Sequence, residues 1–189
     1  MTEETGDENS LREKILNRAD ELCQSGFPFE EEREELEQLW ERLWGEKKAD
    51  APETHFLVFG KNLDTVSSCK VLGCLVIEWY PNSECGRFSD LVVDPDFRRQ
   101  GIARELIWRG AEILRKYAKV SGKELKVFAE ITDPKKQDSD QDSMPPKSRV
   151  EAFKRLGAEQ VPNQNDPLPS PGASMPFGDN LMRVDFDLD

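Results

Sequence analysis

The sequence predicts a mixed α/β (α+β) domain, in which a central sheet of about six or seven strands is flanked by helices. Three observations predict this fold class. Residues 10–44 repeat apolar side chains at helical spacing, residues 70–93 hold two apolar runs around a turn, and residues 88–131 have the pattern strand, helix, strand. The last pattern is a crossover unit, whose two outer strands lie parallel in one sheet.

Two helices are expected before the sheet. Residues 10–13, Ser-Leu-Arg-Glu, have the form of a capping box and begin a helix that Gly26 and Pro28 end. A second helix is expected from about residue 30 to residue 44, and a run of glutamates forms its solvent-facing side. Its apolar face consists of Leu36, Leu39, Trp40, Leu43 and Trp44.

The first strands of the sheet follow these helices. Residues 55–59 have a strand pattern, and residues 70–80 contain the continuous apolar run of a strand that is covered on both faces. Residues 81–86 are typical of a turn, and residues 88–93 form the returning strand. Because the turn is short, we expect the two strands to pair antiparallel.

The second half of the chain alternates helices and strands. A helical stripe covers residues 98–117, and residues 125–131 alternate like a strand. Residues 132–147 are polar and contain three prolines, which predicts a flexible loop that is either a lid over the active site or a disordered insertion. A short helix over residues 148–156 and a strand over residues 180–188 complete the predicted domain.

Length and composition restrict the class of protein. The chain has 189 residues, of which 37% are hydrophobic and 34% charged, which suits one domain with its own core. We expect a disordered acidic segment over residues 1–9 and a single domain over residues 10–189. No window approaches 18 consecutive apolar residues and the acidic start lacks the features of a secretory signal, so we expect a cytoplasmic protein.

Charge and cysteine usage argue against several functions. The net charge is −12, and residues 1–53 carry 17 acidic against 7 basic residues, so we expect no binding to nucleic acid or membranes. Residues 88–131 carry 7 acidic and 9 basic residues, and this stretch either faces an anionic ligand or is the solvated face of a helix. Four cysteines without a C-x-x-C pair, and the single histidine His55, predict reduced thiols and no metal site.

The segment between the returning strand and the central helix suits a pyrophosphate. A helix N-terminus presents unpaired N–H groups and the positive end of the helix dipole. Gly101 and Ala103 leave room for phosphates close to the backbone. Positive charge comes from three arginines, Arg98, Arg99 and Arg104. The patterns G-x-G-x-x-G and G-x-x-x-x-G-K are absent, which excludes a Rossmann fingerprint and a P-loop.

Arg98-x-x-Gly101-x-Ala103 resembles the R/Q-x-x-G-x-G/A acetyl-CoA motif of the GNAT superfamily of N-acetyltransferases. Residues 150–158 are similar to the late helix segment A-x-x-F-Y-x-K-x-G-F, and the resemblance covers residues 54 to about 187. Residues 78–81 and 129–134, Glu-Trp-Tyr-Pro and Ala-Glu-Ile-Thr-Asp-Pro, are similar to segments of an uncharacterised bacterial GNAT subgroup. The resemblance implies the GNAT acyl-CoA N-acyltransferase fold.

The resemblance also implies acetyl-CoA as the acetyl donor. In the family, the fourth strand splays from the fifth and the pantetheine arm enters the gap. Main-chain groups of Leu91 and Val93 would then bind the pantetheine amides, and the N–H of Val93 or a neighbour would polarise the thioester carbonyl. The residues expected at CoA are Leu91, Val92, Val93, Arg98, Arg99, Gln100, Gly101, Ile102, Ala103, Arg104 and Phe153.

The family's usual mechanism is direct attack of a neutral amine on the thioester, so a base must take a proton. Glu78 and Glu130 are the candidates, as base or as anchor of the amine, because each ends an apolar strand near the expected gap. The alternative is a strand-end residue that lies in solvent or pairs with an arginine. Tyr80 points to the same face as Glu78, Asp90 is a third candidate, and His55 is expected to be structural.

One position departs from the family pattern. The late-helix tyrosine that protonates the departing thiolate in many GNAT enzymes is Phe153 here. A thiol with a pKa of about 8.5 leaves without a strong acid, and Tyr80 or water is a substitute. Phe153 is expected to pack on the pantetheine arm or on the sheet.

Two functions are consistent with these residues. The first is an N-acetyltransferase acting on a primary amine, either a small cationic amine or a lysine-type acceptor, as the acidic N-terminal helices favour. The alternative is a non-catalytic acyl-CoA-binding or interaction module on the same fold. Trp40 and Trp44 serve either the core or a homodimer interface.

Overall fold

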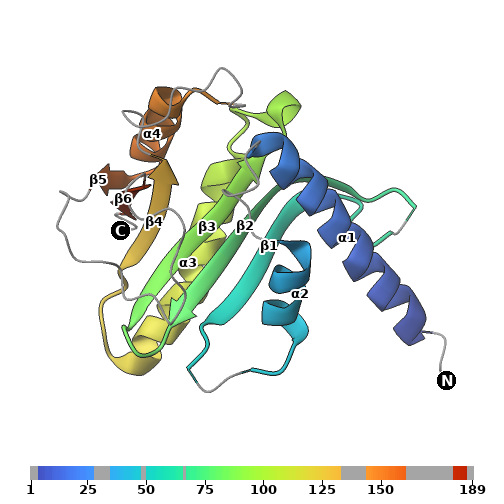
Figure 1. The fold of residues 1–189 in the computed structure, drawn as a ribbon, viewed down its shortest axis with the longest axis horizontal. Helices are drawn as coiled ribbons and strands as arrows, with labels where there is room; N and C mark the ends of the chain where they lie inside the picture. The colour runs from blue at the N-terminus through green and yellow to red at the C-terminus, as the bar shows by residue number, and fades with distance from the viewer. Residues whose placement is uncertain are drawn as a thin grey trace.

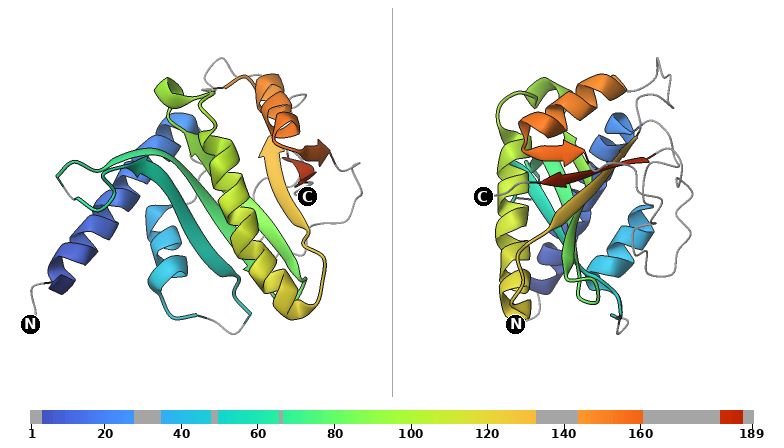
Figure 2. Two further views of the ribbon diagram at one scale, coloured as in Figure 1. Left: turned by 180° about the vertical axis from the view of Figure 1, so that it is seen from behind. Right: turned by 90° about the vertical axis from the view of Figure 1, so that its left-hand side faces the viewer.

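The computed structural model describes residues 4–27, 35–47, 50–65, 67–132, 144–160 and 181–186. The helices are α1 (Glu4–Gly26), α2 (Leu36–Trp44), α3 (Ile102–Ser121) and α4 (Pro146–Arg155). The strands are β1 (Glu53–Lys61), β2 (Lys70–Tyr80), β3 (Cys85–Val93), β4 (Val127–Thr132), β5 (Ala158–Gln160) and β6 (Leu181–Phe186). They form one six-stranded sheet in the order β1-β2-β3-β4-β6-β5 (Figure 1). Helices α1 and α2 cover one face and α3 the other (Figure 2), which confirms the predicted fold class.

Strands β1, β2 and β3 form an antiparallel meander. Every residue of β2 from position 71 to position 79 is buried, as the continuous apolar run predicted. Leu75 and Ile77 face α3, whereas Cys74 and Val76 face α1 and α2. The strand is therefore the centre of both cores.

The β3–α3–β4 segment is the predicted crossover, and β3 and β4 are parallel. Their pairing is short, because only Gly86, Arg87 and Phe88 pair with residues 127–129. On its other side, β4 pairs with β6 over residues 128–132. Figure 1 shows β3 and β4 close together at one end and apart at the other.

Each face of the sheet has its own apolar core. On one face, Leu106 and Leu114 of α3 pack against β2 and β3. On the other, Ala19 of α1 packs against Cys74 and Val92. None of the helices within the described ranges has the length and apolar character needed to cross a bilayer.

Several boundaries differ from those predicted. Helix α1 begins at Glu4 and not at Ser10, so residues 4–9 are helical where a disordered terminus was expected. The helix expected from residue 98 begins at Ile102, because Gly101 takes a left-handed conformation with φ of 85° and serves as the N-cap. Strand β5 was not predicted, because three residues are too few for a pattern.

Two expected segments lie partly outside the described residues. The second helix was expected from residue 30, and the structure gives its second part, α2. The predicted loop over residues 132–147 is described only at its ends, where Thr132 closes β4 and Pro146 begins α4. The division into one domain over residues 10–189 stays a prediction.

Candidate active site

The gap between β3 and β4 is the first part of the site. Because the ladder between these strands ends at Phe88 and Ala129, the rest of β3 pairs only with β2. The N–H of Asp94 donates to the carbonyl of Leu72 across the β2 side. Backbone N–H groups alternate in direction along a strand, so the N–H of Val93 points toward the gap. The strand thus offers hydrogen-bonding groups on its gap side.

The turn between β3 and α3 lies at the wide end of this gap. The Asp94 carboxylate accepts a hydrogen bond from the Asp96 N–H at 2.9 Å, and residues 95–97 form a single 3₁₀ turn. The Arg98 side chain folds back, and its Nε donates to the carbonyl of Val93 at 3.3 Å. Arg99 then takes a left-handed conformation with φ of 63°. This turn directs the chain into α3.

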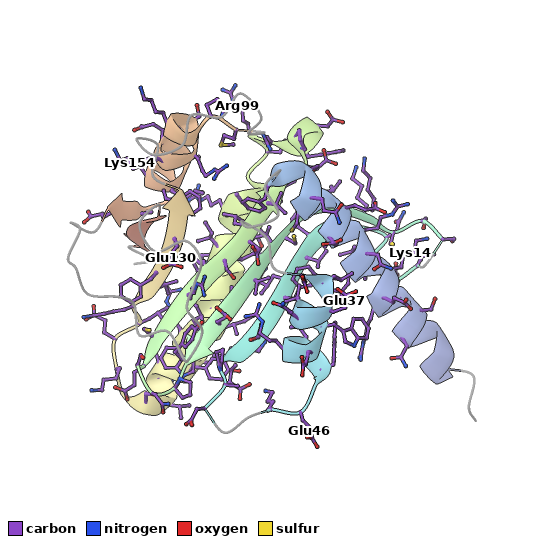
Figure 3. The ribbon with its side chains drawn as sticks, viewed as in Figure 1. Lys14, Glu37, Glu46, Arg99, Glu130 and Lys154 are labelled. Atoms are coloured by element: carbon purple, nitrogen blue, oxygen red, sulfur yellow. The ribbon has the colours of Figure 1, made fainter. Side chains whose placement is uncertain are left out.

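The N-terminus of α3 is open in the way an anion site requires. The first hydrogen bond of the helix runs from Glu105 N–H to Gly101 carbonyl, so the N–H groups before Glu105 have no partner within the helix. A Cβ placed on Gly101 would meet nothing within 4 Å. Gly101 and Arg104 are exposed, and Figure 3 marks Arg99 at this end of the gap.

The other residues expected at CoA are less accessible. Ile102 is 5% exposed and packs in the main core, so only its backbone is available. Val92 is buried against α1. Leu91 and Val93 pack partly against the main core, as does Phe153 on α4. The pantetheine contacts expected from β3 would therefore use main-chain atoms.

A row of charged side chains crosses the sheet on the α2 face. Glu78 of β2 is 1% exposed and forms ion pairs with Arg42 of α2 and, at 3.5 Å, with Arg87 of β3. Arg87 in turn contacts Glu130 of β4 at 3.2 Å. Figure 3 shows Glu130 on β4, further along the gap than Arg99. The structure thus brings the two predicted glutamates together through one arginine.

Tyr80 belongs to the same cluster. Its hydroxyl donates to Glu78 at 2.9 Å, as expected for two residues on one face of a strand. Burial, together with the charge of Glu78, raises the pKa of Tyr80 to about 12. The phenol therefore stays protonated at neutral pH and acts as a hydrogen-bond donor.

Sequence reasoning missed the orientation of Asp90. Two residues of β3, Asp90 and Leu91, stand opposite the single residue Leu75 of β2, which is a β-bulge, and Asp90 has φ of 40°. The bulge turns Asp90 toward the α1 and α2 face, where it lines a small cavity. Burial raises the pKa of Asp90, and Arg42 and Arg87 oppose this effect. The only sequence signal is that aspartate tolerates a left-handed backbone better than most residues.

His55 and the four cysteines are not part of this charged row. His55 Nε2 and the Tyr117 hydroxyl are 2.9 Å apart, and burial lowers the pKa of His55, which fits a structural residue. None of the four cysteines forms a disulfide bond, although the Sγ atoms of Cys23 and Cys74 are 3.8 Å apart. Within the part of the chain that the structure describes, no group of three or more His, Cys, Asp or Glu side chains is arranged for a metal ion.

The sequence model of the acetyltransferase (GNAT) family matches residues 16–134. No curated protein matches the chain in sequence. The fold is similar to an acetyltransferase of the GNAT family from Staphylococcus aureus Mu50, with 11% identity over 93% of this chain and 94% of that chain and a TM-score of 0.59. It is also similar to PH1933 from Pyrococcus horikoshii OT3, with 17% identity over 93% and 92% and a TM-score of 0.54.

A third similar structure was solved with a bound ligand. Rv2747 from Mycobacterium tuberculosis, in complex with CoA and NLQ, shares 15% identity over 90% of this chain and 92% of that chain, with a TM-score of 0.57. At such identities these structures show the fold.

Proposed function

The chain belongs to the acetyltransferase (GNAT) family, and we propose that it transfers the acetyl group of acetyl-CoA to a primary amine in the cytoplasm. The observation that carries the proposal is the early end of the β3–β4 ladder, next to an open α3 N-terminus. The pantetheine arm would lie in the gap along β3, and the pyrophosphate would lie at the start of α3.

The backbone of β3 supports this arrangement. The N–H of Val93 points to the gap, and its carbonyl already accepts a hydrogen bond from Arg98. An N–H in this position would bind a pantetheine amide or polarise the thioester carbonyl as negative charge develops on its oxygen. Leu91, two residues earlier, would hold the other pantetheine group.

The start of α3 supports the phosphate part of the site. The N–H groups of Ile102, Ala103 and Arg104 lie at the positive end of a helix of 20 residues. Gly101 lets phosphates approach the backbone, and Arg99 and Arg104 add positive charge at the surface. These are the chemical requirements of a pyrophosphate.

We assign the base to Glu130, because Glu78 is held by Arg42, Arg87 and Tyr80. Among the described residues, Glu130 has one ion-pair contact, with Arg87, and 17% of its side chain is exposed. The amine nitrogen would form a bond to the acetyl carbon while the bond from that carbon to sulfur breaks. The amine's proton would pass to Glu130, directly or through water, and CoA would leave as a thiolate.

Phe153 cannot protonate this thiolate, because it has no hydroxyl group. Its ring packs partly in the main core, which supports the role on the sheet that the sequence allowed. The pKa of Tyr80 is raised to about 12, and its hydroxyl donates a hydrogen bond to Glu78, so water is the proton source we propose. A thiolate with a pKa near that of free thiols, about 8.5, needs no stronger acid.

A homodimer is part of the same proposal. Trp40 and Trp44 do not enter the core, since they are 40% and 43% exposed, and their ring centroids are 4.4 Å apart with the ring planes tilted by 50°. Two exposed indoles on one helix are typical of a contact surface. Sedimentation velocity of the wild type and of Trp40→Ser tests this part, and a wild-type monomer at high concentration would contradict it.

The experiment that tests the function is a calorimetric titration with acetyl-CoA, followed by amines with detection of the free thiol. Gly101→Glu should abolish acetyl-CoA binding, because it puts a carboxylate where the phosphates lie. Gly122→Glu is the matched control: Gly122 has φ of 70°, also has open space at its Cβ, and ends α3 at its other end. Equal loss in both variants would contradict the assignment of the phosphate site. Binding without thiol release from any amine would favour the alternative, a non-catalytic acyl-CoA-binding module.

A further inference from the structure

Two cysteines from distant parts of the chain meet beneath α1. Cys23 lies in the last turn of α1 and Cys74 in β2, and their Sγ atoms are 3.8 Å apart although 51 residues separate them in the sequence. Both side chains belong to the apolar core on the α1 face of the sheet, with Ala19 and Val92. The structure holds them as free thiols. A bond between the two sulfur atoms would join the helix to the central strand.

Small residues bring this end of α1 close to the sheet. Ala19 is buried against the strands, and a Cβ added to Gly26 would lie 2.6 Å from Cγ2 of Val92. The end of the helix therefore rests directly on β3. Because a disulfide bond is about 2.05 Å long, the two sulfur atoms need to approach by roughly 1.8 Å, a movement within the range of side-chain rotation.

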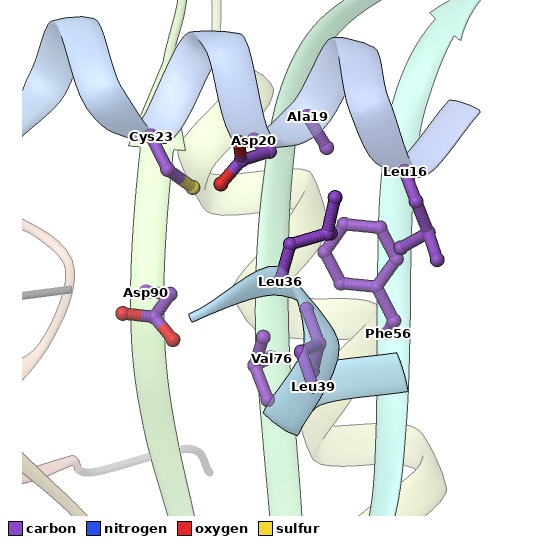
Figure 4. Close-up of a pocket in the computed structure, with 9 residues that line it drawn as sticks. All are labelled: Leu16, Ala19, Asp20, Cys23, Leu36, Leu39, Phe56, Val76 and Asp90. Carbon is purple, nitrogen blue, oxygen red and sulfur yellow. The ribbon is translucent and has the colours of Figure 1, made fainter. Parts of the chain in front are cut away.

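The two thiols differ in accessibility. Cys74 is fully buried, and its hydrogen bond with Cys23, together with burial, raises its pKa well above that of a free thiol. A thiol in such a place does not by itself react with an oxidant in solution. Cys23 is half-buried and lines a cavity of about 30 Å³, which has room for about one water molecule (Figure 4). A small oxidant therefore meets Cys23 first.

We propose that Cys23 and Cys74 are a redox-active pair, which a hydroperoxide oxidises to a disulfide that ties α1 to β2. The Cys23 sulfur attacks the peroxide, so that an S–O bond forms, the O–O bond breaks, and water or an alcohol leaves behind a sulfenic acid. The Cys74 sulfur then attacks the Cys23 sulfur. The S–S bond forms, the S–O bond breaks, and the hydroxyl group leaves as water with the proton of Cys74. Two thiols thus lose two electrons and two protons to one peroxide.

Contact between the thiols supports the second step. The raised pKa of Cys74 leaves little thiolate, but a sulfur atom held 3.8 Å from its target reacts within one molecule and needs no encounter. The pair has no part in the proposed acetyl transfer, so this inference stands or fails independently of that function.

The disulfide would close a loop that contains α2 and β1, because these elements lie between Cys23 and Cys74 in the chain. Closing a loop of this length restricts the unfolded chain and stabilises the folded one. Oxidation should therefore raise the Tm by about 5–15 °C, and dithiothreitol should reverse the change.

The test treats the reduced full-length protein with an excess of hydrogen peroxide. Thiols counted in denaturant should fall from four to two, and the intact mass should decrease by that of two hydrogen atoms. Peptide mapping without reductant should show one linked pair of peptides, which contain Cys23 and Cys74. Thermal unfolding of the reduced and oxidised proteins measures the change in Tm.

Variants assign the two steps. Cys23→Ser should keep its three remaining thiols under the same treatment, because the oxidant no longer has its first target. Cys74→Ala should form a sulfenic acid at Cys23, which dimedone traps, and no linked peptide. Cys85→Ser is the matched control: Cys85 is half-buried like Cys23, and this variant should form the disulfide as the wild type does. Cys23→Ser lies at the edge of the core, so the comparison with Cys85→Ser does not depend on how Cys74→Ala folds.

Several results would overturn the inference. They are four thiols left after treatment of the wild type, a linked peptide that contains Cys69 or Cys85, and equal thiol loss in Cys23→Ser and Cys85→Ser. A disulfide between two molecules, seen as a dimer on a non-reducing gel, would also contradict it. A disulfide within one molecule that leaves the Tm unchanged would show that the bond does not tie α1 to the sheet.

Discussion

Glu78 and Glu130 carry the same functional group but differ in what surrounds them. The side chain of Glu78 is 2% exposed and is held by two arginines and a tyrosine hydroxyl. Glu130 is 17% exposed and has its ion pair only with Arg87 among the described residues. A carboxylate held by three donors is a poor proton acceptor, whereas one at the edge of the gap can exchange protons with a bound amine.

These surroundings predict that the same substitution affects mainly catalysis at Glu130 and mainly stability at Glu78. Glu130→Gln should lower kcat by about 10²- to 10⁴-fold and cost about 1 kcal/mol of stability or less. Glu78→Gln should lower the free energy of unfolding by about 3–5 kcal/mol, because it removes the buried carboxylate charge that Arg42 and Arg87 share. Thiol-release kinetics and urea unfolding check the two effects. Glu124→Gln, in the exposed segment before β4, is the control. A Glu130→Gln enzyme with the wild-type kcat would show that the base is elsewhere.

The buried carboxyl group of Asp90 affects the stability of the fold. Burial raises its pKa from 3.8, so the folded protein binds a proton more readily than the unfolded chain. Stability from this group therefore increases as pH falls through the raised pKa, and at neutral pH the ionised carboxylate is a cost. The titratable or charged groups near it or at the same cavity are Arg42, Arg87, Glu78, Cys74, Cys23 and Asp20.

Asp90→Asn should accordingly raise the free energy of unfolding at pH 7 by roughly 0.5–1 kcal/mol, because it removes the cost of the buried charge. Urea unfolding of both proteins from pH 7 toward pH 3.8, the ordinary pKa of the side chain, should show the gain shrinking, because the wild-type carboxyl then becomes neutral too. An asparagine variant less stable than the wild type at pH 7 would instead indicate that the carboxylate stabilises the fold.

At the residue scale, the sequence predicted which polar side chains belong to the candidate site better than it predicted the contacts between them. Glu78, Tyr80 and Glu130 were predicted because polar groups at the ends of apolar strands are conspicuous. The arginine that joins the two glutamates was not predicted, because Arg87 and Glu130 meet only through a parallel pairing 43 residues apart. The bulge at Asp90 was also missed, since alternation along a strand gives no sign of an extra residue.

Among the elements, α3 determines how the crossover is held on the sheet. Its buried stripe includes Leu106, Gly110 and Leu114, and the face opposite is charged. Leu114 is 0% exposed, whereas Val120 of the same helix is 90% exposed. The helix therefore offers two aliphatic residues at opposite extremes of burial.

Leu114→Ala should lower the free energy of unfolding by about 2–5 kcal/mol, because it leaves a cavity beneath α3 that the packed sheet cannot fill. Val120→Ala should change it by less than about 0.5 kcal/mol. Urea unfolding of both variants measures the difference. Similar values for the two would mean that α3 does not pack on the sheet through this stripe.

At the element scale, the precision of the sequence prediction depended on burial. The bounds of β2 were predicted correctly, because a strand buried on both faces gives an unbroken apolar run. The start of α1 was not, because residues 4–9 are polar and have no apolar period. The start of α3 was placed four residues early, because residues 98–101 suit a turn as well as a helix.

In the whole molecule, negative charge gathers on the N-terminal helices and positive charge gathers at the start of α3. Residues 1–53, which include α1 and α2, carry 17 acidic and 7 basic residues, and these helices cover one face of the sheet. The start of α3, proposed for the phosphates, carries Arg98, Arg99 and Arg104. An ammonium ion and the anionic CoA would thus each meet a field of the opposite sign.

This field predicts a salt effect that depends on the charge of the acceptor. Raising the salt concentration from about 10 mM to about 300 mM shortens the screening length from about 30 Å to less than 10 Å. The kcat/KM of butylammonium should then fall several-fold, because long-range attraction to α1 and α2 is lost. An arylamine that is uncharged at pH 7 is the control, and its kcat/KM should not change beyond any effect of salt on acetyl-CoA, which is kept saturating. An equal fall for both amines would mean that salt acts on the fold or on the chemical step, and not on the attraction of a cation to the acidic helices.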